Sequence, residues 1–354
     1  MNELPLIALA IQIGLMAASF VFVGYMAYRR RETVSFLPYT PRWPIPWEAA
    51  GGLFLAGFLV MLSIAHLTAP KPLADDPVPS VADLTDGEFI SLSLQNGSML
   101  LLLAGITLLA LRSSTRATAA DYGVDSLRDH WREDVWIGTC AALFSFGPVY
   151  AVHMLATYLA DSPSQHPTLL KLAESPNPGV VGVAFLMAVI LAPVWEELVF
   201  RSLLQGWLEK VEDRLLGWRT LSDTPSPAAN QSDNDSPSEQ FPPAADQHDP
   251  NPYTSPLTGG FLSHRSNDAP PTEIPPAEIS YAGLSHGWGP ILISAFLFAF
   301  VHLAAGPDPA AILLLGVILG YVYQRTHRLV PCIVCHMVFN GVSLGLALVT
   351  TLLS

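Results

Sequence analysis

Two adjacent glutamates stand at the end of an apolar run long enough to cross a membrane. No ionisable residue lies between Gly179 and Trp195, and the chain then reads WEELVFR, with Glu196, Glu197 and Arg201. An ionisable side chain at membrane depth costs roughly 3 kcal/mol on insertion scales, so it indicates a function and a partner. Glu197 and Arg201 are four residues apart, which predicts an ion pair on one helix face. Glu196 has no charge partner in its own helix, and we predict that it is a general base.

Two other apolar segments carry polar residues at helical spacing. Phe298 and His302 share a face in FAFVH, and His336 and Asn340 share a face in HMVFN. Polar groups inside a bilayer satisfy one another, because the alternative is an unsatisfied group in hydrocarbon. We therefore expect the three segments to bring these groups to one site.

The composition is that of a membrane protein. Hydrophobic residues make up 51% of the chain and charged residues only 13%, against roughly a quarter charged in soluble domains. Long apolar runs predict an all-α polytopic bundle, since barrel strands would be only about 10 residues long. About eight transmembrane helices are expected, at 6–28, 47–68, 92–111, 135–160, 179–203, 288–305, 308–324 and 329–353.

The basic residues predict the orientation of this bundle. Of the 17 Lys and Arg residues, 15 lie in the loops after the first, third, fifth and seventh segments. The other two, Lys71 and Lys171, lie in loops on the opposite side. The positive-inside rule then places the loops rich in Lys and Arg in the cytoplasm and both termini outside, in a plasma or inner membrane. The start, MNEL, lacks a basic region, which favours a retained first helix over a cleaved signal peptide.

Four regions follow from these patterns. Residues 1–134 form an N-terminal three-span region with an amphipathic lead-in, and 135–214 form the first part of a catalytic core. Residues 215–287 are a Pro/Ser/Asp-rich cytoplasmic insert, predicted to be disordered because it is poor in apolar residues. It is a tolerated linker or a regulatory tail. The second part of the core, 288–354, completes the last four spans, so the site must be assembled across the insert.

The order of motifs resembles the CPBP family of intramembrane proteases, which includes the type II CAAX prenyl endopeptidases and the abortive-infection and bacteriocin self-immunity proteins. EExxxR, FxxxH and HxxxN follow one another in separate apolar segments, and the resemblance covers about 135–354. The long insert departs from the family's compact core. The residues that carry the resemblance are Glu196, Glu197 and Arg201, then Phe298 and His302, then His336 and Asn340.

The resemblance implies a role for each matching residue. Glu196 and His302 would activate a water for attack on a peptide carbonyl, and His336 and Asn340 would supply the oxyanion hole. Glu197, Arg201 and Phe298 would support them. Family members have also been described as metalloproteases, and the ligands of a zinc ion would be Glu196, His302 and His336. We favour a metal-free mechanism, because the chain has no HExxH and an amide oxygen is a poor zinc ligand.

Two competing interpretations were weighed. Cys332 to His336 spells CxxCH, the haem attachment string, but covalent haem is attached outside the cytoplasm, so we expect no haem and reduced, buried cysteines. The second is a non-catalytic membrane protein, either a proton-coupled transporter or a scaffold, that uses the same polar residues. A carrier usually shows an inverted repeat, and none is visible. We expect membrane lipid and a peptide or membrane-protein substrate as partners, and no nucleic acid.

Depth sets a condition on the protease interpretation. At 1.5 Å per residue, His302 lies about 20 Å and His336 about 10 Å from the cytoplasmic start of its segment. The groups meet if the turn after His302, with Gly306 in it, does not reach the outer surface. We therefore predict a cavity that opens toward the cytoplasm.

Overall fold

The computed structural model describes residues 4–31, 36–40, 45–48, 57, 84–125, 129–161, 166–215, 280–281, 284–303 and 306–353. All of them belong to one compact unit, which comprises Met1–Trp218 and Ile274–Ser354. The other unit, Arg219–Glu273, lies outside the described residues. Most of the predicted apolar segment 47–68 and nearly all of the predicted insert 215–287 also lie outside them.

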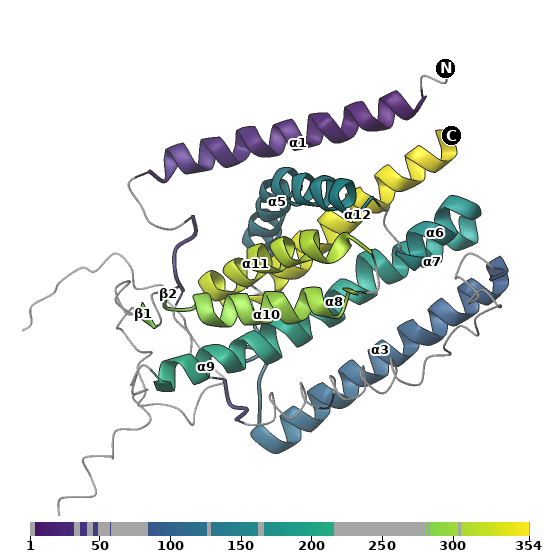
Figure 1. Cartoon of the computed structure of the whole chain (residues 1–354). Coiled ribbons are helices and arrows are strands. Elements are labelled where there is room, and N and C mark those ends of the chain that lie inside the picture. The colour runs from purple at the N-terminus through teal and green to yellow at the C-terminus, as the bar shows by residue number, and fades with distance from the viewer. Residues whose placement is uncertain are drawn as a thin grey trace, which may run out of the picture. The chain divides into compact units, whose positions relative to one another are not determined.

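Helices make up most of the described chain (Figure 1). They are α1 (Leu4–Arg29), α3 (Asp86–Thr115), α5 (Trp131–Ala160), α6 (Pro167–Glu174), α7 (Pro178–Phe185), α8 (Ala192–Glu197), α9 (Gly206–Leu215), α10 (Trp288–Phe300), α11 (Asp308–Thr326) and α12 (Leu329–Leu353), with the π-helical segments η2 (Leu186–Leu191) and η3 (Leu198–Gln205) on either side of α8. Two short strands, β1 (Ser280–Tyr281) and β2 (Leu284–Ser285), pair antiparallel before α10. The predicted helical class is confirmed, with this short ladder as an addition.

Six helical stretches in the described residues are long and apolar enough to cross a membrane. They are Leu9–Arg29, Asp86–Thr115, Trp131–Ala160, Pro178–Leu215, Asp308–Thr326 and Leu329–Leu352. The prediction of eight spans is thus confirmed for six. Helix α10 has 13 residues, which gives a length of about 20 Å against about 30 Å of hydrocarbon. A helix of this length does not span the membrane, and the expected turn inside the membrane after His302 stays a prediction.

Local sequence explains where the helices near the site begin. Asn177 caps α7, because its side-chain oxygen accepts hydrogen bonds from the backbone N–H groups of Gly179 and Val180, and Pro178 takes the first helical position. Pro167 likewise occupies the start of α6. Both starts therefore follow from the residue types present.

The helical stretch from Pro178 to Leu215 leaves the α-helical hydrogen-bond register in two places. The segments η2 and η3 have the wider π-helical repeat, which is rare and occurs mostly at functional sites. In this register the backbone N–H of Ala192 donates to the carbonyl of Met187, five residues back. Pro193 has no N–H to donate to the next carbonyl, that of Ala188. The sequence of this helix thus leaves the backbone carbonyl of Ala188, about two turns before Glu196, open as an acceptor.

The core that holds the site is packed by α5, α10, α11 and α12. Helices α5 and α12 approach closely at Gly138, where an added Cβ would lie 2.6 Å from the carbonyl oxygen of Pro331. Stacked rings of Phe146, Tyr150 and Phe339 fill the space between the same two helices. Close packing of this kind leaves α12 little freedom to move relative to α5.

The two parts of the core meet where the insert leaves and rejoins the helices. The His286 Nε2 atom lies 2.7 Å from Asp213 Oδ1, and the backbone N–H of Gly287 donates to Glu212 Oε2 at 2.7 Å. These contacts join the end of α9 to the start of α10. Residues more than 70 positions apart in the chain are therefore held side by side.

Candidate active site

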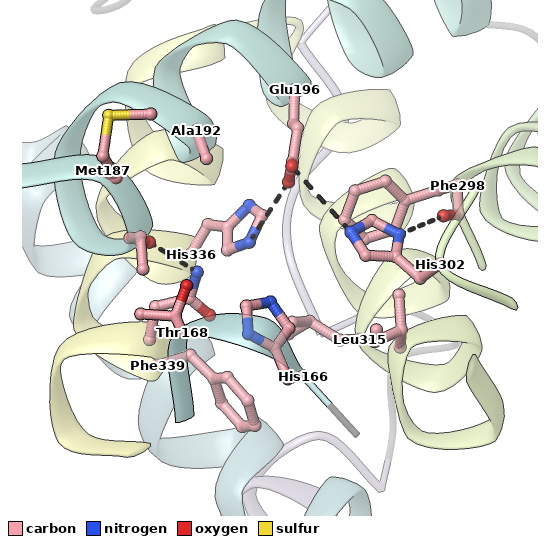
Figure 2. Close-up of a pocket in the computed structure, with 13 residues that line it drawn as sticks. His166, Thr168, Met187, Ala192, Glu196, Phe298, His302, Leu315, His336 and Phe339 are labelled. Atoms are coloured by element: carbon pink, nitrogen blue, oxygen red, sulfur yellow. Dashed lines mark hydrogen bonds and ion pairs between the residues drawn. The ribbon is translucent and has the colours of Figure 1, made fainter. Parts of the chain in front are cut away.

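Side chains from both parts of the core surround a pocket of about 300 Å³ (Figure 2). Of the residues predicted from the sequence, Glu196 comes from α8, His302 follows the end of α10, and His336 comes from α12. Phe298 and Asn340 line the same pocket. The structure thus brings together groups that the sequence places on three segments, and it removes the difficulty of their unequal depth.

Two imidazoles face the carboxylate of Glu196 from opposite sides (Figure 2). The Nε2 atom of His302 lies 3.9 Å from Glu196 Oε1, and the Nε2 atom of His336 lies 3.7 Å from Glu196 Oε2. Both distances exceed a direct hydrogen bond and match groups that share a bridging water. The Glu196 side chain is 21% exposed, so the carboxylate is reachable from the pocket.

The other ring nitrogen of each imidazole is already engaged. His302 Nδ1 lies 2.8 Å from the carbonyl oxygen of Phe298, and His336 Nδ1 lies 2.9 Å from Glu197 Oε1. A carbonyl or carboxylate oxygen at this distance accepts a hydrogen bond, so in a neutral ring Nδ1 carries the proton. The lone pair is then on Nε2, directed at Glu196. Both histidines are thereby held as acceptors toward the pocket.

Glu197 and Arg201 form the predicted ion pair behind the pocket wall. Arg201 Nε donates to Glu197 Oε2 at 3.0 Å, and both side chains are 0% exposed. A second guanidinium nitrogen, Arg201 Nη1, donates to the Ser294 hydroxyl on α10 at 3.0 Å. The two glutamates therefore differ as the sequence predicted, since Glu197 is paired within its helix and Glu196 is not.

Phe298 is the apolar support of the site. Its ring makes edge contacts with the rings of His302, at 5.2 Å between centroids, and His336, at 5.8 Å. The guanidinium carbon of Arg201 lies 5.2 Å from the same ring centroid. Phe298 is 1% exposed, so its packing fixes both imidazoles and the cation behind them.

The side-chain amide of Asn340 makes a hydrogen bond to the backbone rather than pointing all of its donors into the pocket. Its Nδ2 atom donates to the carbonyl oxygen of Ala188 at 2.9 Å, which is the acceptor left open by Pro193. One of the two N–H donors of this amide is thus spent on the η2 backbone. The predicted oxyanion pair is consequently short of donors, because His336 Nδ1 is bound to Glu197 as well.

The donor set was also compared with a metal site. Among the described residues, no group of three or more His, Cys, Asp or Glu side chains is arranged to hold a metal ion. The predicted zinc ligands Glu196, His302 and His336 do converge, with the Nε2 atoms 3.9 and 3.7 Å from the carboxylate oxygens, but they do not form such a group. We therefore derive no step through a metal. Cys332 and Cys335 are fully buried free thiols, as predicted.

One pocket residue was missed by sequence reasoning. His166 lines the pocket together with Thr168, at the start of α6. Burial lowers the pKa of His166, the charge of Asp308 raises it and His302 lowers it further, and the net direction is down. The sequence does show a helix start in His-Pro-Thr, but nothing in it indicates that this short helix folds back against the site.

A buried polar layer follows Glu196 along its helix, at the end of the bundle that carries the basic loops. Gln205 Nε2 donates to Glu209 Oε1 at 3.0 Å and to the Gly320 carbonyl at 2.8 Å, and His327 Nε2 lies 3.3 Å from Glu209 Oε2. Gln205 and Tyr323 are fully buried. On the other side the wall is the start of α6, which lies toward the two ends of the chain (Figure 1).

Comparison with known proteins finds a family match in one part of the chain. A family model described as type II CAAX prenyl endopeptidase Rce1-like matches residues 278–342. The match covers the FxxxH and HxxxN motifs, and it confirms at the family level the resemblance inferred from the motifs. No curated protein and no solved structure matches the chain.

Proposed function

Because the region 278–342 is Rce1-like, we propose that this membrane protein is an intramembrane endopeptidase that hydrolyses a peptide bond with activated water. One observation carries the proposal. A partly exposed carboxylate, Glu196, faces the Nε2 atoms of His302 and His336 across gaps of 3.9 and 3.7 Å. A water molecule in such a gap donates its two hydrogens to Glu196 and to one imidazole Nε2, and these two acceptors polarise it.

The proposed reaction balances without a metal. The water donates one hydrogen to Glu196 and the other to an imidazole Nε2. Glu196 takes a proton, and the hydroxide forms a bond to the carbonyl carbon of the substrate. The protonated Glu196 then returns the proton to the amide nitrogen as the C–N bond breaks. The products are a carboxylic acid and an amine.

The buried groups hold the acceptors in place. Glu197 keeps the His336 ring in the tautomer that has its lone pair toward Glu196, and the Phe298 carbonyl does the same for His302. An oriented carboxylate behind an imidazole raises the basicity of that ring. Arg201 offsets the charge of Glu197, so that Glu196 is the carboxylate left for proton transfer.

The direction of access was predicted to be cytoplasmic, with both termini outside. We keep the cytoplasmic opening as part of the proposal. The alternative is entry on the α6 side, where His166 and Thr168 line the pocket. An impermeant reagent that labels Gly306→Cys together with a cysteine placed in α6, such as Thr168→Cys, from the side of the termini supports entry on the α6 side. Labelling of both only from the basic side would contradict it.

Turnover tests the proposed function. The purified full chain is given an internally quenched peptide in which a farnesylated cysteine is followed by the last three residues, which is the CAAX arrangement. Glu196→Gln keeps the shape and removes the base, so we expect cleavage to fall at least about 100-fold. The matched control is Glu133→Gln, on α5 with a half-exposed side chain, which should retain the wild-type rate.

Two results would reject the proposal. One is full cleavage by Glu196→Gln, and the other is solute flux that depends on Glu196 with no peptide cleavage, which would support the transporter or scaffold alternative. Chelation tests the metal-free step separately. Activity that is lost on chelation and restored by zinc but not by magnesium would replace the metal-free mechanism with a zinc mechanism.

A further inference from the structure

His166 is the polar side chain on the wall of the pocket that faces Glu196. Figure 2 shows its ring across the pocket from Glu196, with His336 and His302 on either side. It enters from α6, outside the three motif-bearing segments. Its backbone is held, because the N–H groups of Leu169 and Leu170 donate to the His166 carbonyl oxygen and the next residue is a proline.

Stabilisation of an oxyanion requires hydrogen-bond donors on the pocket wall that carries His166. The attacking water is held by acceptors at Glu196, so the carbonyl oxygen of the substrate becomes an oxyanion on the side away from them. His336 uses Nδ1 for a hydrogen bond with Glu197, and its Nε2 atom faces Glu196. Asn340 donates one of its two amide N–H groups to the Ala188 carbonyl. The groups expected to form an oxyanion hole therefore supply only the second N–H of the Asn340 amide.

Imidazole chemistry fits this need. A neutral histidine carries one N–H and a protonated histidine carries two, so His166 is a donor in either state. Donors that are already aimed at the site of developing charge stabilise the transition state without reorganisation. Burial favours such a donor as well, since hydrogen bonds to charge are stronger where water is excluded.

We propose that His166 is a catalytic residue that donates a hydrogen bond to the oxygen of the scissile carbonyl as the tetrahedral intermediate forms. It would act together with the free N–H of Asn340. The inference rests on the proposed peptidase function and adds to it a residue that none of the three motifs contains.

The test separates kcat from KM with the same quenched farnesyl peptide. His166→Phe keeps a ring of similar size and removes the donors, and we expect kcat to fall about 100-fold with KM changed less than about threefold, the range for loss of one oxyanion donor. His166→Gln restores an N–H donor and should recover at least about tenfold of that loss. A packing role alone would not produce this rescue by an amide.

His153→Phe is the matched control. His153 lies on α5, 3.4 Å from Asp308, and does not line the pocket, so its replacement should leave kcat within about twofold. The melting temperature of each variant is measured beside activity. If His166→Phe unfolds at low temperature, the kcat of His166→Gln, which has an N–H donor, is compared with that of His166→Leu, which has none.

The outcomes distinguish the two proposals. Wild-type cleavage that Glu196→Gln abolishes and His166→Phe leaves unchanged overturns the role of His166 and keeps the peptidase. A loss in His166→Phe that His166→Gln does not restore also overturns the donor role. No cleavage of the farnesyl peptide by the wild-type chain overturns the proposed function and the inference that rests on it.

Discussion

Replacing one member of the buried pair Glu197 and Arg201 should destabilise the fold far more than replacing both. In Glu197→Gln the amide still offers an oxygen to His336, while the guanidinium loses its counter-charge in a place where it is 0% exposed. The remaining contacts of Arg201 are the neutral Ser294 hydroxyl and the face of Phe298. Breaking a buried pair in this way costs about 3–5 kcal/mol.

The reverse change should cost less. In Arg201→Met the carboxylate of Glu197 keeps its hydrogen bond with His336 Nδ1 at 2.9 Å, and a hydrogen bond to a charged acceptor is stronger than a neutral one. We expect a loss of about 3 kcal/mol, at the lower end of the range for a broken buried pair. The double variant removes both charges, and replacement of a buried pair by apolar or neutral groups is often close to neutral. The two single losses should then exceed the double loss by at least about 2 kcal/mol.

The assay is a double-mutant cycle on the full chain in detergent micelles, with denaturant unfolding followed by circular dichroism. Arg214→Met is the control, because Arg214 pairs with Glu48 at 2.7 Å with both side chains more than half exposed, and exposed pairs contribute about 0–1 kcal/mol. Additive losses within about 0.5 kcal/mol, or single losses no larger than that of the control, would refute the argument that an uncompensated buried charge dominates.

Two further predictions concern packing and pH. Gly138→Ala should destabilise the chain by about 1–3 kcal/mol, because the new Cβ would lie 2.6 Å from a backbone oxygen of α12. Gly345→Ala is the control, since no atom lies within 4 Å of its added Cβ, and it should be neutral or slightly stabilising. Thermal melts of the two variants test the difference. Burial lowers the pKa of His286, but its hydrogen bond and charge interaction with Asp213 outweigh burial, so the pKa is raised. The stability contributed by His286 is then fully present below its ordinary pKa of about 6.5 and is lost as pH rises through the raised value. The stability difference between wild type and His286→Gln should shrink as pH rises from 5 to 9, and a difference that grows over this range would contradict the assignment.

Much of the fold was predictable because lipid imposes simple rules on a chain. Apolar runs of sufficient length predicted six of the helices that the structure describes. The shortness of the segment that became α10 was also visible from its sequence, and it implied a turn inside the membrane. The register changes at η2 and η3 were not predictable, since they depend on how η2 packs against α12 and η3 against α10 rather than on helix propensity.

The chemical groups of the site were predictable for a related reason. Charged and amide side chains are costly in an apolar segment, so Glu196, His302, His336 and Asn340 stood out by type and position. The pairing of Glu197 with Arg201 followed from four-residue spacing along one helix, which is local geometry.

What the sequence determined by itself is the membrane class, the residues able to do chemistry and the pairing of Glu197, not Glu196, with Arg201 in their helix, because each depends on residue type and local spacing. Only the tertiary structure decided which ring nitrogen faces the carboxylate, where the Asn340 amide donates, and that His166 belongs to the pocket. The His336 and Asn340 contacts join segments more than 100 residues apart along the chain, and the relative position of such segments is set by packing of whole helices and not by any local pattern.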